Sequence, residues 1–196
     1  MTKIKNLYGL ILAGGFSKRM GQDKALMSYR SKPQVEYVYD ALSVCCENVF
    51  LSKRPHQPAY QNIPFINDDE DFSNIGPLGG ILSAMKSYPE VSWLVMACDL
   101  PFVTRETLEN LIQNRDAQKM ATAFKSTHDG LPEPLCAIWE AHGYQKILEF
   151  FKKDIHCPRK VLINSDITIL KQKNPQWLNN VNDPREFAQA KREIFL

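Results

Sequence analysis

The chain has 196 residues, of which 44% are hydrophobic and 23% are charged, and its formal net charge is +2. This length suits one domain, residues 1–196, built around one sizeable core, and the composition excludes a largely disordered protein. The nearly balanced charge gives no general affinity for nucleic acid or for a membrane surface, so we expect neither as a partner.

The cysteines and the apolar runs indicate the cellular compartment of the protein. The chain has five cysteines, an odd number, without the short paired spacing of a zinc ribbon or a redox motif. The first apolar run, residues 7–13, ends in glycines before a signal-peptide core can form. No later run approaches the roughly 18 apolar residues of a membrane helix. We therefore expect free thiols in a cytoplasmic protein that is neither secreted nor membrane-spanning.

Short apolar runs alternate along the chain with helical periodicity, which is typical of an α/β fold with parallel strands and crossover helices. The apolar stripes of the helices are assigned to core packing rather than to ligand binding. A last helix is predicted after Asp183, an N-cap acid followed by Pro184 at the first helical position and Glu186 at the third. The other predicted strands lie near residues 7–13, 49–51, 65–66, 93–97, 120–124 and 135–139, and the other predicted helices near 35–42, 78–85, 108–112 and 144–151.

A glycine-rich segment, residues 12–24 (L-A-G-G-F-S-K-R-M-G-Q-D-K), follows the first predicted strand. The adjacent Gly14 and Gly15 allow the backbone to approach phosphate oxygens and point N–H groups at them. Arg19 and Lys24 are natural phosphate partners. The spacing matches neither the P-loop nor the dinucleotide fingerprint. The segment therefore predicts a different phosphate cradle, with an ordinary strand-to-helix turn as the alternative.

Carboxylates stand at the ends of two predicted strands. Asp99, in M-A-C-D-L-P, follows residues 93–97, and ligands of open α/β sheets gather at the carboxyl ends of strands. A hard cation that bridges phosphates needs such an oxygen ligand, although an aspartate that caps a turn is the alternative. The acidic run 68–71 and the glycines of 76–80 follow the predicted strand at residues 65–66. Each segment also has a purely structural interpretation: the acidic run is typical of a solvated loop face, and the glycines are typical of a turn that enters a helix.

Residues 12–24 resemble the L-A-G-G-x-S-x-R-M-G-x-D-K signature of the NTP-transferase superfamily, and most closely that of the molybdenum cofactor guanylyltransferases. Residues 98–101 resemble the C-D-x-P metal motif of that family. The resemblance implies a single-domain, Rossmann-like three-layer α/β fold with a mostly parallel sheet, of the nucleotide-diphospho-sugar transferase type. It implies nucleotide contacts at Leu12, Ala13, Gly14 and Gly15, triphosphate binding and activation by Arg19 and Lys24, and a catalytic Mg²⁺ on Asp99.

The later segments carry weaker parts of the resemblance. It implies that Asp68 contacts the nucleotide, as does Gly79 in the G-P-L-x-G segment, and that Asn182 in an N-x-N-x-P element approaches a pterin. An asparagine-rich turn is the alternative for Asn182. Two positions depart from the family pattern: Ser52 stands where an amide is expected on the nucleotide side, and Glu133 stands where a histidine often precedes proline.

The implied reaction joins GTP and molybdopterin, or Mo-molybdopterin, into molybdopterin guanine dinucleotide and pyrophosphate, with transient contacts to carrier or acceptor proteins. Cytidylyl transfer to molybdopterin, or nucleotidyl transfer to another small phosphorylated acceptor, is the alternative within this class. A non-catalytic nucleotide-binding regulatory protein is the alternative from another class. The joint presence of Arg19, Lys24 and Asp99 argues against a protein without turnover.

Overall fold

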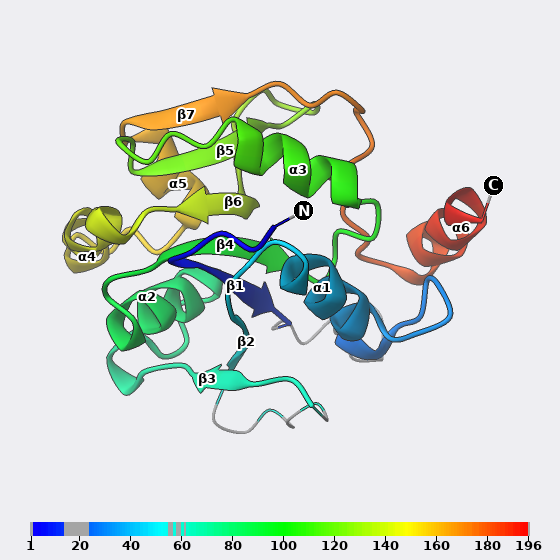
Figure 1. Ribbon diagram of the computed structural model, residues 1–196, viewed down its shortest axis with the longest axis horizontal. Helices are drawn as coiled ribbons and strands as arrows, with labels where there is room; N and C mark the ends of the chain where they lie inside the picture. Colours follow the sequence, from blue (N-terminus) through cyan, green and yellow to red (C-terminus); the bar gives the residue numbers. More distant parts are fainter. Residues whose placement is uncertain (1, 14–23, 55–56, 58–59, 61, 196) are drawn as a thin grey trace.

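The computed structural model describes residues 2–13, 24–54, 57, 60 and 62–195. Within these residues one sheet of seven strands has the order β3-β2-β1-β4-β6-β5-β7 (Figure 1). Neighbouring strands are parallel except that β6 runs antiparallel to both β4 and β5. The predicted α/β fold with a mostly parallel sheet is confirmed. The strands are β1 (Leu7–Leu12), β2 (Val49–Lys53), β3 (Phe65–Asn67), β4 (Ser92–Ala97), β5 (Ala121–Lys125), β6 (Pro132–Trp139) and β7 (Ile167–Leu170).

Helices cover both faces of the sheet, which gives three layers (Figure 1). Gly9 of β1 faces α1, since an added Cβ there would lie 3.1 Å from Leu42 Cδ1. Leu12, three residues further along the strand, faces α2, because a Cβ on Gly80 would lie 3.1 Å from Leu12 Cδ2. The α-helices are α1 (Gln34–Ser43), α2 (Pro77–Ser87), α3 (Arg105–Gln113), α4 (Tyr144–Lys152), α5 (Pro158–Ile163) and α6 (Pro184–Ile194), and single 3₁₀ turns span Lys24–Leu26, Glu70–Phe72 and Ala141–Gly143.

The main core is centred on strand β4. All six of its residues are buried, as a strand covered by helices on both faces requires. Its neighbours β1 and β6 are nearly as fully buried. No helix among the described residues is long and apolar enough to cross a bilayer.

Two elements went unpredicted, α5 and β7. Helix α5 has six residues, too few to show a periodic apolar stripe. Strand β7 has four residues at the edge of the sheet, none of which is fully buried, so its sequence lacks the continuous apolar run of an interior strand. Strand β6 also begins earlier than predicted, at Pro132.

The last helix, α6, begins as its sequence predicts. The Asp183 side chain accepts hydrogen bonds from the backbone N–H groups of Arg185 and Glu186, and Pro184 occupies the first turn. The Glu186 carboxylate reaches one residue further back than in a standard capping box and accepts from the N–H of Asn182 at 2.6 Å. The cap of α6 therefore also fixes the backbone of Asn182.

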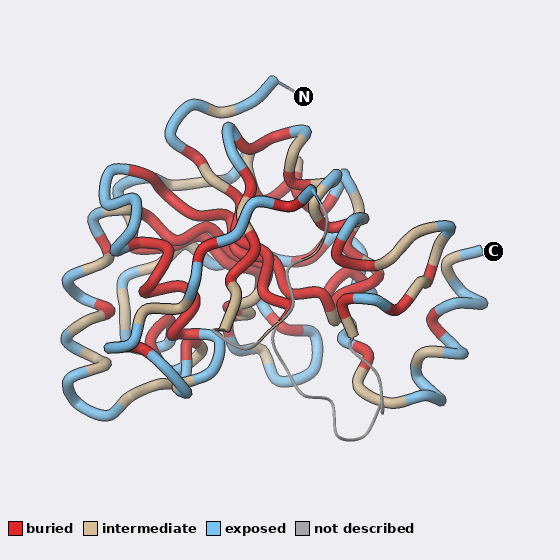
Figure 2. The backbone as a smooth tube through the Cα atoms, turned by 90° about the horizontal axis from the view of Figure 1, so that it is seen from below, coloured by how far each residue is buried: buried red, intermediate tan, exposed pale blue. Residues whose placement is uncertain are grey.

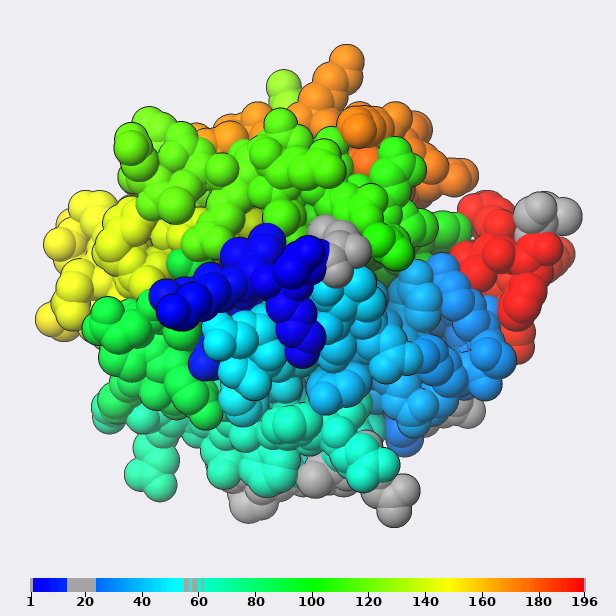
Figure 3. All heavy atoms as spheres, viewed as in Figure 1, coloured from blue at the N-terminus to red at the C-terminus, as the bar shows by residue number. Residues whose placement is uncertain are grey.

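Helix α6 lies to one side of the sheet, beside the segment that leads into α1 (Figures 1 and 3). It packs on a small cluster of its own, formed by Met27, Tyr29, Val181 and Ala190. The Tyr29 and Phe187 rings meet edge to face at 4.8 Å. We call this group the satellite cluster; it is separate from the main core that fills the centre of Figure 2.

Candidate functional site

The carboxyl ends of β1, β2 and β4 meet at one edge of the sheet. Leu12 pairs with Ser52 of β2 on one side and with Ala97 of β4 on the other. The ladder continues one step further, because the N–H of Cys98 donates to the carbonyl of Leu12 at 3.1 Å. Residues that follow these three strands therefore share one edge, where open α/β sheets bind their ligands.

Three residues predicted from separate motifs converge at this edge. The Lys24 ammonium donates to Oδ1 of Asn182 at 2.7 Å and lies 3.8 Å from Oδ2 of Asp99. The segment before α6 is held in place because the N–H of Val181 donates to the carbonyl of Asp99 at 2.9 Å. The side chains of Lys24 and Asp99 remain 17% and 25% exposed, so solvent or a ligand can still reach them.

Opposing effects act on the Asp99 carboxyl. Burial raises its pKa, the Lys24 ammonium opposes that rise, and Glu133 adds a smaller upward contribution. Lys24 thus favours the anion that burial disfavours. An anionic carboxylate beside an ammonium group provides one oxygen ligand for a cation and one positive charge for a phosphate.

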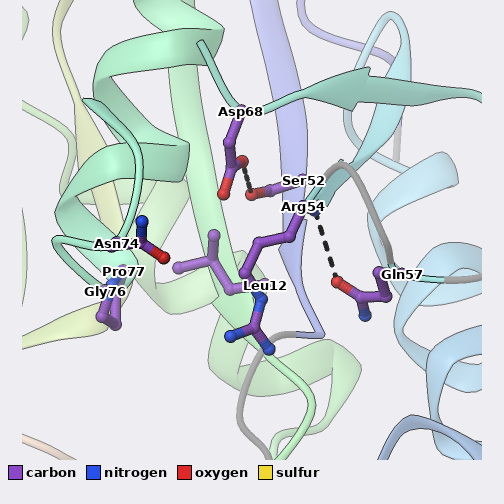
Figure 4. Close-up of a pocket in the computed structure, with 8 residues that line it drawn as sticks. All are labelled: Leu12, Ser52, Arg54, Gln57, Asp68, Asn74, Gly76 and Pro77. Carbon is purple, nitrogen blue, oxygen red and sulfur yellow. Dashed lines mark hydrogen bonds between the residues drawn. The ribbon is translucent and has the colours of Figure 1, made fainter. Parts of the chain in front are cut away.

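A pocket of about 200 Å³ lies at the same edge of the sheet, where Leu12 and Ser52 form part of its lining. Figure 4 shows the residues that line it. The Ser52 hydroxyl donates to Oδ1 of Asp68 at 2.8 Å. Burial raises the pKa of Asp68, whereas the hydrogen bond from Ser52 and the charge of Arg54 lower it. The pocket therefore places a partly desolvated hydrogen-bond acceptor in its wall. Its lining residues are Leu12, Ser52, Arg54, Gln57, Asp68, Asn74, Gly76 and Pro77.

Some of the residues predicted to contact the nucleotide lie at the pocket, and others do not. Leu12, Ser52 and Asp68 line the pocket, and Ala13 adjoins it, because its carbonyl accepts from the amide of Gln57 at 3.4 Å. Gly14, Gly15 and Arg19 lie outside the described residues.

Gly79 is not among the residues that line the pocket. An added Cβ would lie 2.3 Å from the Phe72 carbonyl oxygen, so this glycine allows α2 to pack against the preceding 3₁₀ turn. The next residue, Gly80, faces the pocket wall, since a Cβ there would lie 2.3 Å from Oγ of Ser52. The predicted contact of Gly79 with the nucleotide stays a prediction.

Sequence reasoning missed three polar residues that line the pocket: Arg54, Gln57 and Asn74. Arg54 directly follows β2, so the rule that ligands gather at strand ends was a sufficient signal for it. Asn74 gives no such signal, because its position depends on a backbone φ of 62° in the turn before α2.

Glu133, one of the two residues that depart from the family pattern, is engaged in an ion pair. Its carboxylate accepts from Arg159 at 2.6 Å, and Arg159 also contacts Asp129 at 2.9 Å. This network joins α5 to β6 and to the turn before β6, and it affects the site through the charge that Glu133 exerts on Asp99.

A second carboxylate lies at the opposite end of β4. Glu140 is 3% exposed and receives two hydrogen bonds from Arg115, both at 2.7 Å, and one from the Ser92 hydroxyl at 2.6 Å. Both carboxylate oxygens are therefore occupied by groups of the protein itself.

The sequence profile of the MobA-like NTP transferase domain matches residues 9–167. A molybdenum cofactor biosynthesis bifunctional protein of Synechocystis sp. is 39% identical over 93% of this chain, which spans 53% of the length of that relative. A probable molybdenum cofactor guanylyltransferase of Bacillus cereus is 28% identical over 95% of this chain and 96% of the relative.

Solved structures share the fold. Molybdopterin-guanine dinucleotide biosynthesis protein A from Archaeoglobus fulgidus superposes with a TM-score of 0.78 at 23% identity, over 96% of this chain and 98% of that chain. A 2-C-methyl-D-erythritol 4-phosphate cytidylyltransferase from Thermus thermophilus gives a TM-score of 0.68 at 10% identity, with the same two coverages. Identities this low show the fold and leave the substrate to the residues of the site.

Proposed function

The chain belongs to the MobA-like NTP transferase family, and we propose that it transfers GMP from GTP to molybdopterin or Mo-molybdopterin, which yields molybdopterin guanine dinucleotide and pyrophosphate. The observation that carries this proposal is the convergence of Lys24, Asp99 and Asn182 at the edge of the sheet that also carries the pocket of Asp68. Relatives of nearly the same length, named as probable molybdenum cofactor guanylyltransferases, support the choice of base and acceptor.

The chemistry needs charge neutralisation and little else. A phosphate oxygen of the acceptor attacks the α-phosphorus of GTP, the bond to the β-phosphate oxygen breaks, and pyrophosphate leaves with the electron pair. The attacking phosphate is already anionic, so no general base is required. The Lys24 ammonium offsets charge that builds on the departing pyrophosphate, and we assign the same task to Arg19.

Asn182 has two tasks in this proposal. Its Oδ1 holds the Lys24 ammonium at 2.7 Å. The same amide has an NH₂ group whose two donors suit the acceptor atoms at the edge of a pterin. Asn182 thereby connects the position of Lys24 to the presence of the acceptor substrate.

We further propose that Asp99 holds Mg²⁺, which when bound supplies positive charge next to the α-phosphate. Within the described ranges, no three His, Cys, Asp or Glu side chains gather into a cage for a metal. Asp99 alone fits the need, because Mg²⁺ at nucleotide sites commonly takes one or two carboxylates together with substrate phosphates and water.

A cytoplasmic location and transient contact with a molybdenum cofactor carrier or acceptor protein complete the proposal. None of the five cysteines, all of which the structure describes, forms a disulfide, as a reducing compartment favours.

Measuring pyrophosphate release with molybdopterin and each of the four NTPs tests the proposal. We expect release with GTP and little with CTP, ATP or UTP. A preference for CTP rejects guanylyl transfer in favour of cytidylyl transfer. Nucleotide binding without turnover on molybdopterin or any other phosphorylated acceptor identifies a binding protein instead. A heat-denatured sample controls for spontaneous hydrolysis.

A further inference from the structure

The loop that carries Asp99, residues 98–104, connects β4 to α3. Its far end is anchored because the Thr104 side chain caps α3. The middle of the loop depends on a distant part of the chain, since the carbonyl of Pro101 accepts a hydrogen bond from Nη2 of Arg30 at 3.1 Å. Pro101 is buried and has no N–H, so this carbonyl is its only backbone hydrogen-bonding group.

Tyr37 of α1 holds Arg30 in place and contacts the same loop. The guanidinium carbon of Arg30 lies 4.0 Å from the centre of the Tyr37 ring, which is the geometry of a cation–π interaction. The Tyr37 hydroxyl donates to the carbonyl of Val103 at 3.1 Å. These two side chains, which we call the Arg30–Tyr37 stack, therefore bind the loop at Pro101 and at Val103.

The stack also joins the two members of the proposed functional pair. Arg30 lies between α1 and the 3₁₀ turn that begins at Lys24. Lys24 and Asp99 themselves are 3.8 Å apart, which exceeds the usual N–H···O range, so a direct hydrogen bond does not set their separation. The bond from Arg30 to Pro101 links the segment of Lys24 to the loop of Asp99.

The stability of the fold does not by itself account for a guanidinium at this position. Nη1 of Arg30 is buried and has no hydrogen-bond partner within the part of the chain that the structure describes. A buried donor without a partner costs desolvation free energy. This cost opposes the gain from the hydrogen bond to Pro101, so we expect Arg30 to contribute little net stability. Its contribution is then the position of the loop.

We propose that Arg30 is a positioning residue for Asp99: through the Pro101 carbonyl it fixes the loop so that the Asp99 carboxylate stays beside the Lys24 ammonium and open to a metal ion. This inference rests on the proposed function, because it takes Asp99 as the ligand of Mg²⁺. Arg30 itself contacts neither substrate nor metal. A displacement of an active-site group by about 1 Å can lower a rate about 100-fold, so a contact two residues away is sufficient to matter.

Three variants of the intact protein test the proposal. Arg30→Met keeps an unbranched side chain against the Tyr37 ring and removes the hydrogen bond to Pro101. Arg30→Lys restores a cation and a donor without the planar fork. Arg105→Met is the matched control, because Arg105 begins α3 directly after the same loop, is 65% exposed and pairs with Glu109.

The first readout is metal binding without turnover. Mn²⁺ serves as the probe, since carboxylate oxygens suit it as they suit Mg²⁺, and its free ion is measured by electron paramagnetic resonance. The nucleotide is guanosine α,β-methylene triphosphate, which cannot release pyrophosphate, and Asp99→Asn gives the baseline without the carboxylate. We expect Arg30→Met to weaken Mn²⁺ binding about tenfold, as is typical when a group that orients a metal ligand is lost. Arg30→Lys should recover most of the affinity.

The second readout separates positioning from folding. With GTP and molybdopterin at saturating Mg²⁺, we expect kcat of Arg30→Met to fall about tenfold while KM for GTP stays within about twofold of the wild type. The thermal midpoint should stay within about 3 °C of the wild type. In the double variant Arg30→Met/Asp99→Asn, the Arg30 substitution should have no further effect on kcat, because it acts through Asp99.

Mn²⁺ binding and kcat of Arg30→Met equal to those of Arg105→Met overturn the role of Arg30 and leave the proposed function standing. Independent, multiplying losses in the double variant also overturn it. Should Arg30→Met fail to fold, Tyr37→Phe removes only the hydrogen bond to Val103, and we expect Mn²⁺ binding about threefold weaker; an unchanged affinity rejects the proposal. A wild-type protein that releases no pyrophosphate overturns the proposed function itself.

Discussion

Two carboxylates at opposite ends of β4 are paired with cations in different ways. Glu140, beside the start of the strand, is 3% exposed and receives three hydrogen bonds of 2.6–2.7 Å from Arg115 and Ser92. Asp99, beyond the end of the strand, is 25% exposed and lies 3.8 Å from the Lys24 ammonium. The first pair has hydrogen-bond geometry, whereas the separation in the second exceeds the usual N–H···O range.

The difference is the one expected between a structural ion pair and the pair that we propose to be functional. A carboxylate that is 3% exposed and accepts three hydrogen bonds from the protein itself is out of reach of a ligand. A carboxylate that is 25% exposed and has a cation nearby keeps lone pairs for a metal ion, and its partner keeps donors for a phosphate. We expect substitutions at Glu140 to act on folding and substitutions at Asp99 to act on turnover.

The largest effect is predicted for Glu140→Gln. The change leaves the Arg115 charge without its partner in a site where Glu140 is almost fully buried. Breaking a buried pair in this way costs about 3 kcal/mol of unfolding free energy. Urea denaturation measures the loss, and turnover per folded molecule at low temperature should match that of the wild type. A change in unfolding free energy of less than about 0.5 kcal/mol, which is typical of surface substitutions, contradicts the structural role of Glu140.

Asp99→Asn tests the other end of the strand. The amide keeps the shape and removes the charge proposed to hold Mg²⁺, so we expect kcat for pyrophosphate release to fall about 100-fold, a loss typical when a group that stabilises transition-state charge is removed. Urea denaturation of the same variant should show no loss of stability. Turnover near the wild-type value, with normal dependence on added Mg²⁺, eliminates Asp99 as the metal ligand.

Asn182→Ala refines the contrast within the functional pair. Removing the amide frees the Lys24 ammonium from its 2.7 Å hydrogen bond. Hydrogen bonds to charged groups contribute on the order of 1.5 kcal/mol, so we expect kcat/KM to fall about tenfold. Asn180→Ala provides the control, because Asn180 is exposed and precedes the same helix. Equal losses in the two variants would show that the loop, rather than the Lys24 contact, matters.

The smallest effect is a dependence of stability on pH. Burial raises the pKa of Asp99 in the folded protein above its ordinary value of 3.8. Between that value and the folded-state pKa the folded protein binds more protons, so ionising Asp99 as the pH rises through this window lowers stability. Asp99→Asn should therefore be slightly more stable than the wild type at pH 7, and the gain should disappear as the pH falls below 3.8. Denaturation series at both pH values measure it, and a gain that grows on acidification contradicts the burial of Asp99.

The sequence was sufficient to predict that Lys24 and Asp99 lie in one site, but not how the pocket is lined. Lys24 and Asp99 follow from motifs at strand ends, and the cap at Asp183 places Asn182 before a helix. Gly79 and Gly80 show the limit. Adjacent helical residues point about 100° apart, so the exact helix register decides which of them faces the pocket.

Asn74 shows a second limit. Its place in the pocket comes from a left-handed φ in a turn, and hydrophobic periodicity carries no information about such a conformation. The short elements α5 and β7 were missed for a related reason, because six and four residues are too few to repeat a pattern.

The satellite cluster has a consequence for the timing of the reaction. Helix α6 rests on Met27, Tyr29, Val181 and Ala190 rather than on the main core. Elements with few buried contacts open at a lower free energy than the whole domain, as independent cooperative units. Each such local opening withdraws Asn182 from Lys24 while the sheet stays intact. We therefore expect the lifetime of the docked state of α6 to limit how long the lysine remains aligned in any one encounter with substrate.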